Sequence, residues 1–498
     1  MTHLLGIDLG TSSVKVVLTD FEGHLVASAS HEYPIDTPQA GYAEQNPEDW
    51  RQATFEAIRE LTEKVEHLKI DAIGLAGQMH SAVLIDHSGN VVRPAIIWSD
   101  QRSAAQVNEI VDRIGENRIL ETTGTLPATG FMNATLVWMR DHEPESLDHA
   151  AACISPKDYV RLQLTGEIHA EVSDASATGL FDIGRINWAT DIIDELGLPQ
   201  RLFPDAVKST EVVGKLTPDA AKQLNLPAGI PIVAGCADQA AQAVGNRVLN
   251  SGNGTITIGT GGQIMTPVDR PTALQGLHTF CHAVPNRWYL LGATLSAGLS
   301  LRWLRNLLQM DGDPAAYEKL SLMASRVAIG ADGLLFLPYL TGERSPIADP
   351  LASGTFIGLS LRHHQGHMAR AIMEGVAFSL RHVLETMQES SVHVETLIAA
   401  GNGLQSEIWR RIVADVLNNT LQLTPLIEQT GLGAAFIAGI SVGVYQDFND
   451  IPSAPDASYV EPSAENASFY KTRYALYRAT YASLRSIMHK LSSSRTML

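Results

Sequence analysis

The segment Asp8-Leu9-Gly10-Thr11-Ser12-Ser13-Val14-Lys15 lies between two apolar runs, at residues 4–7 and 14–18. A related segment, Gly259-Thr260-Gly261-Gly262-Gln263, lies half a chain length later, again between apolar runs. Each pattern predicts two strands joined by a turn of glycine and hydroxyl residues, whose backbone N–H groups can bind phosphate oxygens. P-loop and Rossmann proteins instead hold phosphate at the N-terminus of a helix. The repetition therefore predicts two related halves that face one another across a nucleotide.

The length and charge of the chain limit the classes it can belong to. A chain of 498 residues is too long for one hydrophobic core, and we expect two domains, 1–247 and 248–498. Apolar residues make up 45% and charged residues 18%, as in an ordinary globular protein. The formal net charge of −18 argues against nucleic acid or an acidic membrane surface as the main partner.

The cysteines and the N-terminus bear on the compartment. Cys153, Cys236 and Cys281 are an odd number without C-x-x-C spacing, which supports neither a zinc ribbon nor a disulfide framework. The N-terminus lacks a signal-peptide pattern, and no apolar run is long enough for a membrane helix. We therefore expect a cytoplasmic protein that has no membrane partner.

The order of predicted elements indicates the fold. The first three strands are followed by a helix at about 48–64 and a buried strand at 70–76. The second half repeats this order, with a strand at 288–291, a helix at about 367–385 and a strand at 396–400. Strand–strand–strand–helix–strand is the order of the ribonuclease-H-like ATPases, which include actin, hexokinase and Hsp70. We predict an α/β protein with two such domains flanking a central cleft.

From residue 4 to about 485, the chain resembles the FGGY carbohydrate kinases, and most closely the xylulokinases among them. Gly354–Leu359, followed after seven residues by His367–Glu374, fits the second family signature. The first signature keeps Trp138 but has Thr135 where lysine is usual. The resemblance implies ATP-dependent phosphorylation of D-xylulose to D-xylulose 5-phosphate, with ATP and Mg²⁺ as cofactors. It also implies a homodimer, with sugar bound mainly to the first domain and ATP across the second.

Asp238 is the candidate for the catalytic base. It follows the apolar run 230–234, and small residues around it leave room for a substrate. Phosphoryl transfer to a hydroxyl needs a group that accepts the proton. An aspartate between a strand and a helix can equally be a helix cap. The residues alone leave both interpretations open, and the resemblance favours the base.

The two turns supply candidates for holding phosphates. A carboxylate at Asp8 would repel phosphate unless a cation lay between them, so we expect Mg²⁺ at Asp8 and Asp238, directly or through water. The alternative is that Asp8 caps its turn. We expect the nucleotide phosphates to contact the two turns, at Thr11, Ser12, Lys15, Gly259, Thr260 and Gly261. The family usually has serine at the position of Gly261.

Two glycine-rich segments are candidates for the adenosine site. Gly401-Asn402-Gly403 follows an apolar strand, and Gly431 and Gly433 open a predicted helix. Small residues would allow a flat base to lie against the backbone. Close packing of a helix on a sheet also requires small residues, so this alternative stays open.

The sugar site is predicted from two segments that resemble the family. Met79 and His80 end a strand, where the imidazole could hydrogen-bond a ketose oxygen and Met79 could pack on the carbon chain. Trp98 and Asp100 belong to a second segment expected to border the sugar. Gln239 stands where xylulokinases commonly have asparagine. Arg344, in a loop that resembles one beside the nucleotide, is expected to hold structure rather than to contact phosphate.

Two kinds of alternative function fit parts of the pattern. One is an FGGY kinase for another acceptor, such as ribulose, L-xylulose, gluconate or glycerol. The other is an actin- or Hsp70-like nucleotide switch without a sugar substrate. Sugar-stimulated ADP formation would distinguish the kinases from the switch.

Overall fold

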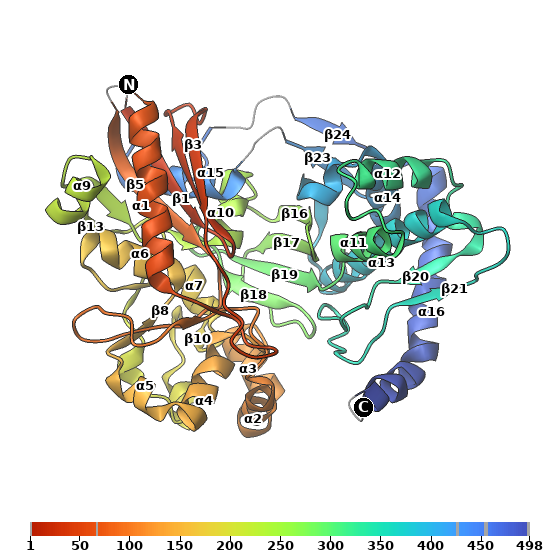
Figure 1. The fold of residues 1–498 in the computed structure, drawn as a ribbon, viewed down its shortest axis with the longest axis horizontal. Helices are drawn as coiled ribbons and strands as arrows, with labels where there is room; N and C mark the ends of the chain where they lie inside the picture. Colours follow the sequence, from red (N-terminus) through yellow and green to blue (C-terminus); the bar gives the residue numbers. More distant parts are fainter. Residues whose placement is uncertain (1, 66–67, 425–427, 453–456, 496–498) are drawn as a thin grey trace.

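The computed structural model describes residues 2–65, 68–424, 428–452 and 457–495, and contains two large sheets with helices packed on them (Figure 1). The first sheet has the strand order β13-β14-β5-β1-β2-β3, with β15 beside β5. Its strands are β1 (Thr2–Leu9), β2 (Ser13–Thr19), β3 (Leu25–Glu32), β5 (Lys69–Gly77), β13 (Val212–Lys215), β14 (Pro231–Val233) and β15 (Cys236–Ala237).

The second sheet repeats this arrangement in the order β18-β19-β17-β16-β22-β23-β24. In each sheet the first strand of the repeat pairs antiparallel with the next strand and parallel with a later one, as β1 does with β2 and β5. The predicted pair of ribonuclease-H-like folds is therefore confirmed. The strands are β16 (Gly252–Ile258), β17 (Gly262–Val268), β18 (His278–Cys281), β19 (Trp288–Thr294), β22 (Val394–Ala400), β23 (Thr420–Leu423) and β24 (Ser458–Val460).

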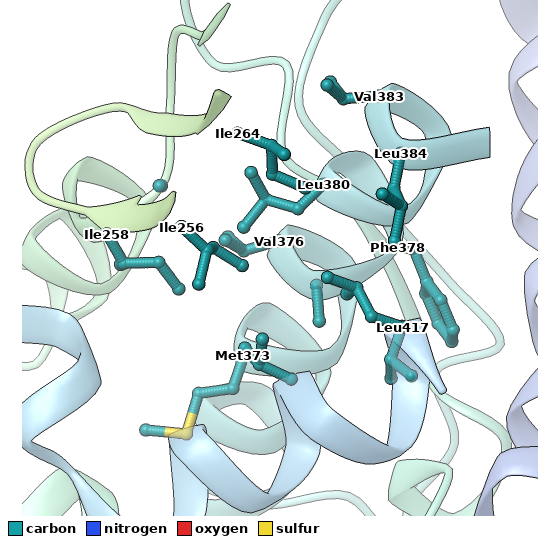
Figure 2. Packing of buried hydrophobic residues seen from close by; sticks show 14 of the residues in the cluster. Ile256, Ile258, Ile264, Met373, Val376, Phe378, Leu380, Val383, Leu384 and Leu417 are labelled. Atoms are coloured by element: carbon teal, nitrogen blue, oxygen red, sulfur yellow. The ribbon is translucent and has the colours of Figure 1, made fainter. Parts of the chain in front are cut away.

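Amphipathic helices cover both sheets. Helix α1 (Pro47–Lys64) begins where the Asn46 side chain accepts a hydrogen bond from the N–H of Glu48, and it packs on β2 and β3. Helix α13 (Gln365–Glu389) crosses the second sheet, and Val376 and Leu380 face the isoleucines of β16 and β17 (Figure 2). Each such buried side chain contributes about 1.5–3 kcal/mol, and the sequence predicted both helices because their apolar residues recur at helical spacing.

Further helices complete both halves. Those of the first half, several of which lie below the first sheet in Figure 1, are α2 (Ala104–Ile114), α3 (Glu116–Thr123), α4 (Met132–His142), α5 (Pro144–His149), α6 (Pro156–Thr165), α7 (Val172–Ala177), α8 (Thr190–Glu195) and α9 (Pro218–Leu224). Those of the second half are α11 (Gly298–Leu307), α12 (Ala316–Ser325), α14 (Glu407–Leu417) and α16 (Ala464–Arg495), and the short strands β20 (Leu335–Leu337) and β21 (Thr355–Ile357) pair beside them.

Helix α15 (Gln429–Ser441) crosses from the second half to the first. It packs on β1 and β5 and against α10 (Asp238–Gly245), so it lies among strands made much earlier in the chain (Figure 1). The contact is close because glycines face its backbone: a Cβ at Gly6, Gly74 or Gly245 would fall well inside the 3.0 Å that real Cβ atoms keep from an α15 carbonyl oxygen. Gly433 of α15 lies equally close to α10. The two halves of the sequence therefore share a packed region, and the domain boundary expected near residue 247 stays a prediction.

Candidate active site

The register of the first sheet places two carboxylates at the same edge. Asp8 lies at the end of β1, opposite Ala76 of the parallel strand β5, and Ala237 of β15 pairs with Gly77 of β5. Asp8 and Asp238 therefore leave the sheet at the carboxyl ends of neighbouring parallel strands, where open α/β sheets bind their ligands. The charge of Asp8 acts on Asp238 strongly enough to raise the pKa of that carboxyl.

Asp238 is the first residue of α10, while Ala237 occupies the N-cap position. The Asp238 Oδ1 atom accepts a hydrogen bond from the N–H of Gln239 at 2.7 Å, so the carboxylate also binds the first turn of the helix. Burial, followed by the charges of Asp8 and Asp174, raises the pKa of Asp238 to about 8. An aspartate of this basicity is suited to accepting a proton near neutral pH.

Asp8 lines a cleft of about 420 Å³ between the two halves. Lys15, its cross-strand neighbour, pairs with Glu428 at the start of α15, with an Nζ–Oε2 distance of 2.9 Å. Burial raises the pKa of Asp8 to about 7, Lys15 lowers it, and Glu428 raises it further. The cleft also contains Gly401 and Asn402. Its wall thus carries two carboxylates, Asp8 and Glu428, and two cationic side chains, Lys15 and Arg410.

A small cavity of about 140 Å³ is lined by Asp238, and both halves of the chain contribute to it. The predicted residues Thr11, Met79, His80, Trp98 and Gln239 all line it. The Thr11 Oγ1 atom accepts a hydrogen bond from the indole N–H of Trp98 at 2.9 Å, which holds this hydroxyl at the cavity wall. The small cavity is where the geometry brings the expected sugar-binding residues together.

His80 is held in one orientation and one protonation state. Its Nδ1 atom is 2.7 Å from the carbonyl oxygen of Ala177, so Nδ1 carries the proton and Nε2 is left as an acceptor. The ring stacks on Phe131 with a centroid distance of 3.9 Å. Burial lowers the pKa of His80 to about 3, which keeps the ring neutral. Its φ of 72° is strained for a non-glycine residue, a feature that concentrates at functional sites.

Gly259 and Thr260 of the second turn border a large cavity of about 690 Å³, whose wall also contains Asn402 and Gly403. The carbonyl oxygens of Gly259 and Thr260 accept hydrogen bonds from the first N–H groups of α11, at 2.9–3.0 Å. A Cβ at Gly261 would meet the carbonyl oxygen of Thr294 at 2.5 Å. This contact explains why the chain has glycine there and leaves no room for the serine that is usual in the family.

Several expected site residues line none of these three cavities. The carboxylate of Asp100 binds the N–H of Ala43 at 2.6 Å and pairs with Arg102 at 2.8 Å, which makes Asp100 a support for the loop behind Trp98. Gly431 and Gly433 lie where α15 packs on the first half, as the close-packing alternative anticipated. Ser12 and Gly261, both expected to contact the nucleotide phosphates, also lie outside the cavity walls.

Two family models together match most of the chain. Residues 3–245 match the N-terminal domain of the FGGY family of carbohydrate kinases, and residues 254–442 match its C-terminal domain. The chain belongs to the FGGY family of carbohydrate kinases. ATP and a sugar are therefore the substrates of this FGGY kinase, and the large cavity, the cleft and the small cavity together provide room for both.

Named relatives support the same conclusion. This FGGY kinase is 36% identical over 501 residues to the xylulose kinase of Bacillus subtilis (strain 168), which spans 99% of this chain and 100% of the relative. It is 34% identical over 490 residues to the xylulose kinase of Escherichia coli (strain K12), spanning 97% and 99%. The solved xylulose kinase from Rhodospirillum rubrum superimposes with a TM-score of 0.92 at 30% identity, spanning 98% of this chain and 100% of that one.

The structure of this FGGY kinase adds residues that the sequence did not indicate. The second half supplies Gln263, His278, Phe280, Leu291, Ala293 and Arg344 to the small cavity. The wall of the small cavity is therefore built by both halves of the chain, while the expectation that sugar binds mainly to the first domain stays a prediction. Five of these residues lie in β17, β18 and β19, where the alternating apolar pattern predicts strands but not ligand contacts. Arg344 was expected to hold structure beside the nucleotide, yet it faces the small cavity.

Among the described residues, no helix is both long enough and apolar enough to cross a membrane.

Proposed function

We propose that this FGGY kinase transfers the γ-phosphoryl group of ATP to the terminal hydroxyl of D-xylulose. The observation that carries the proposal is the position of Asp238, which lines the small cavity and is electrostatically coupled to Asp8 in the cleft. A sugar in the small cavity and phosphates in the cleft would meet at this carboxylate. The relatives named xylulose kinase supply the choice of sugar.

In this mechanism Asp238 accepts the proton of the acceptor hydroxyl as the oxygen–phosphorus bond forms. Lys15 is placed to bind phosphate oxygens in exchange for Glu428, its present partner. Met79 packs on the carbon chain of the sugar, and the Nε2 atom of the neutral His80 accepts a hydrogen bond from a sugar hydroxyl. Closure of the cleft would exclude water and favour the sugar over hydrolysis of ATP.

The chemistry of the donor set fits Mg²⁺ as the metal. Mg²⁺ prefers oxygen ligands and is commonly bound by one or two carboxylates together with substrate phosphates, and Asp8 and Asp238 are two such carboxylates. Bound there, it would neutralise the negative charge that develops on the phosphates. Within the described residues, three potential ligands gather only at Asp20, Glu22 and His24, in the turn between β2 and β3, so the phosphates must complete the magnesium site.

For the nucleotide, we propose that the large cavity receives adenosine and the cleft receives the phosphates. Asn402 lines both, and Gly401, Gly403, Gly259 and Thr260 lie on their walls. Gly401 has a φ of 83° and no room for a side chain beside Ile258, which keeps the backbone accessible there. We also propose a domain division at residue 247, a cytoplasmic location and a homodimer. Light scattering after size-exclusion chromatography tests the homodimer.

The test measures ADP release with MgATP and a panel of acceptors: D-xylulose, L-xylulose, D- and L-ribulose, gluconate and glycerol. We expect the highest kcat/KM for D-xylulose and its loss in the Asp238→Asn variant. Preference for another acceptor would replace the sugar and keep the reaction. ADP release that is independent of every sugar would overturn the kinase assignment in favour of a nucleotide switch.

A further inference from the structure

Arg344 brings a cation from the second half of the chain to the wall of the small cavity. Its neighbour Glu343 has both carboxylate oxygens engaged elsewhere: Oε1 accepts from the backbone N–H groups of Leu295 and Arg344 at 2.8 Å, and Oε2 accepts from the Ser379 hydroxyl at 3.2 Å. Across the part of the chain that the structure describes, the Arg344 guanidinium has no ion pair or side-chain hydrogen bond. Arg344 is half-buried, and a cation partly removed from water normally has such a partner, which leaves the cavity's ligand to supply one.

The contacts of Arg344 locate it at one end of the small cavity. Its guanidinium carbon lies 5.9 Å from the centre of the Phe131 ring. Phe131 in turn stacks on His80 at 3.9 Å and lies 5.8 Å from the ring of His278. The charge of Arg344 helps to lower the pKa of both histidines. The pKa of Asp238 is raised by burial first and then by the charges of Asp8 and Asp174. Asp238 and Arg344 both line the small cavity, one from each half of the chain.

Arg344 and His80 offer different hydrogen-bonding groups to a ligand in the small cavity. An arginine only donates hydrogen bonds, and the Nε2 atom of His80 only accepts them. The first two carbons of a ketose match this pair, because the carbonyl oxygen accepts and the adjacent hydroxyl can donate. A carboxylate in the same position would satisfy the arginine but would offer no proton to His80.

We propose that Arg344 binds the carbonyl end of the acceptor ketose and selects it over the corresponding polyol. The carbonyl oxygen at C2 accepts from the guanidinium, the hydroxyl at C1 donates to His80, and the terminal hydroxyl reaches Asp238. This inference rests on the proposed function, and it gives the sugar a direction in the cavity. It also makes sugar recognition depend on both halves of the chain, because His80 and Arg344 come from different halves.

The test compares D-xylulose with xylitol, which has a hydroxyl in place of the carbonyl. Dissociation constants are measured for both by calorimetry, and kcat/KM is measured for D-xylulose, in wild type, Arg344→Met and Arg344→Lys. Arg185→Met, which removes an exposed arginine in a different region, is the matched control. We expect Arg344→Met to weaken D-xylulose binding by about 10- to 100-fold, the range for a hydrogen bond to a charged group, and xylitol binding much less. Arg344→Lys should recover part of the difference.

Three results would overturn the inference. If Arg344→Met leaves both the D-xylulose and the xylitol affinity unchanged, Arg344 does not contact the carbonyl. An equal loss for both ligands would make Arg344 a structural support, as would an altered KM for MgATP with unchanged sugar binding. If Arg344→Met fails to fold, as judged by its thermal unfolding, Arg344→Lys decides by the same ratio. A wild-type enzyme that does not phosphorylate D-xylulose refutes the proposed function instead, before any variant is compared.

Discussion

Replacing Asp238 with asparagine should remove activity and at the same time stabilise the fold. The substitution keeps the size of the side chain but removes the proton acceptor, so kcat should fall by about 10²- to 10⁴-fold. The fold gains because the carboxyl is poorly solvated: its pKa is raised from 3.8 to about 8. At pH 7 that displacement corresponds to about 4 kcal/mol if it is fully realised. Asp238 is partly exposed to the cavity and water screens it, so we expect ~2 kcal/mol.

The stability gained by Asp238→Asn should depend on pH. A carboxyl whose pKa is higher in the folded state binds more protons when folded, so it lowers stability as the pH rises from about 4 to about 8. Asparagine does not titrate. The stability difference between Asp238→Asn and wild type should therefore be small at pH 4.5 to 5 and should grow as the pH rises toward 8.

Urea denaturation at three pH values, from about 5 to about 8, measures this difference directly. Asp112→Asn, on the exposed side of α2, is the matched control and should show no such growth. A difference that stays constant with pH would mean that Asp238 is already ionised at pH 5 in the folded protein, which would refute the desolvation argument. Retention of more than about a tenth of wild-type kcat would remove Asp238 from the role of base.

Two further predictions concern α15 and its N-terminus. Gly433→Ala should lower the free energy of unfolding by about 2 kcal/mol, because overpacking against α10 costs more than the gain of about 1 kcal/mol in helix propensity. Urea denaturation measures the change, and Gly312→Ala, at a position with open space around it, is the control. A variant more stable than wild type would contradict the close contact. Glu428→Gln should release Lys15 and lower the KM for MgATP by roughly two- to fivefold, the equivalent of about 0.5–1 kcal/mol. A higher KM in steady-state kinetics would show that Glu428 assists nucleotide binding instead.

Local patterns in the sequence were enough to predict the fold. The turns Asp8–Lys15 and Gly259–Gln263 join paired strands as expected, and α13 extends only a few residues beyond the predicted helix. Hydrophobic periodicity and turn chemistry act over short stretches, so one sequence can reveal them.

The site could be predicted only in part, because its walls come from distant segments. Met79 and His80 were recognisable by their motif, whereas His278 and Phe280 lie on a strand whose pattern is that of ordinary buried sheet. Asp100 illustrates the opposite error, a residue expected at the site whose carboxylate instead pairs with Arg102. The sequence alone does not distinguish such an ion pair from a contact with a ligand. Which polar residue faces a cavity depends on tertiary packing, which local patterns do not contain.

The position of α15 has a consequence for how the protein is made. Its buried residues, including Leu432, Phe436 and Ile437, pack on strands that emerge from the ribosome far earlier. Until residues 429–441 have been synthesised, the face of β1 and β5 around Leu4 and Ala72 lacks its contacts with α15. Such a nascent sheet exposes apolar surface and is prone to aggregate. We expect a gene fragment that encodes only residues 1–247 to yield insoluble protein, and co-expression of the remainder to rescue it.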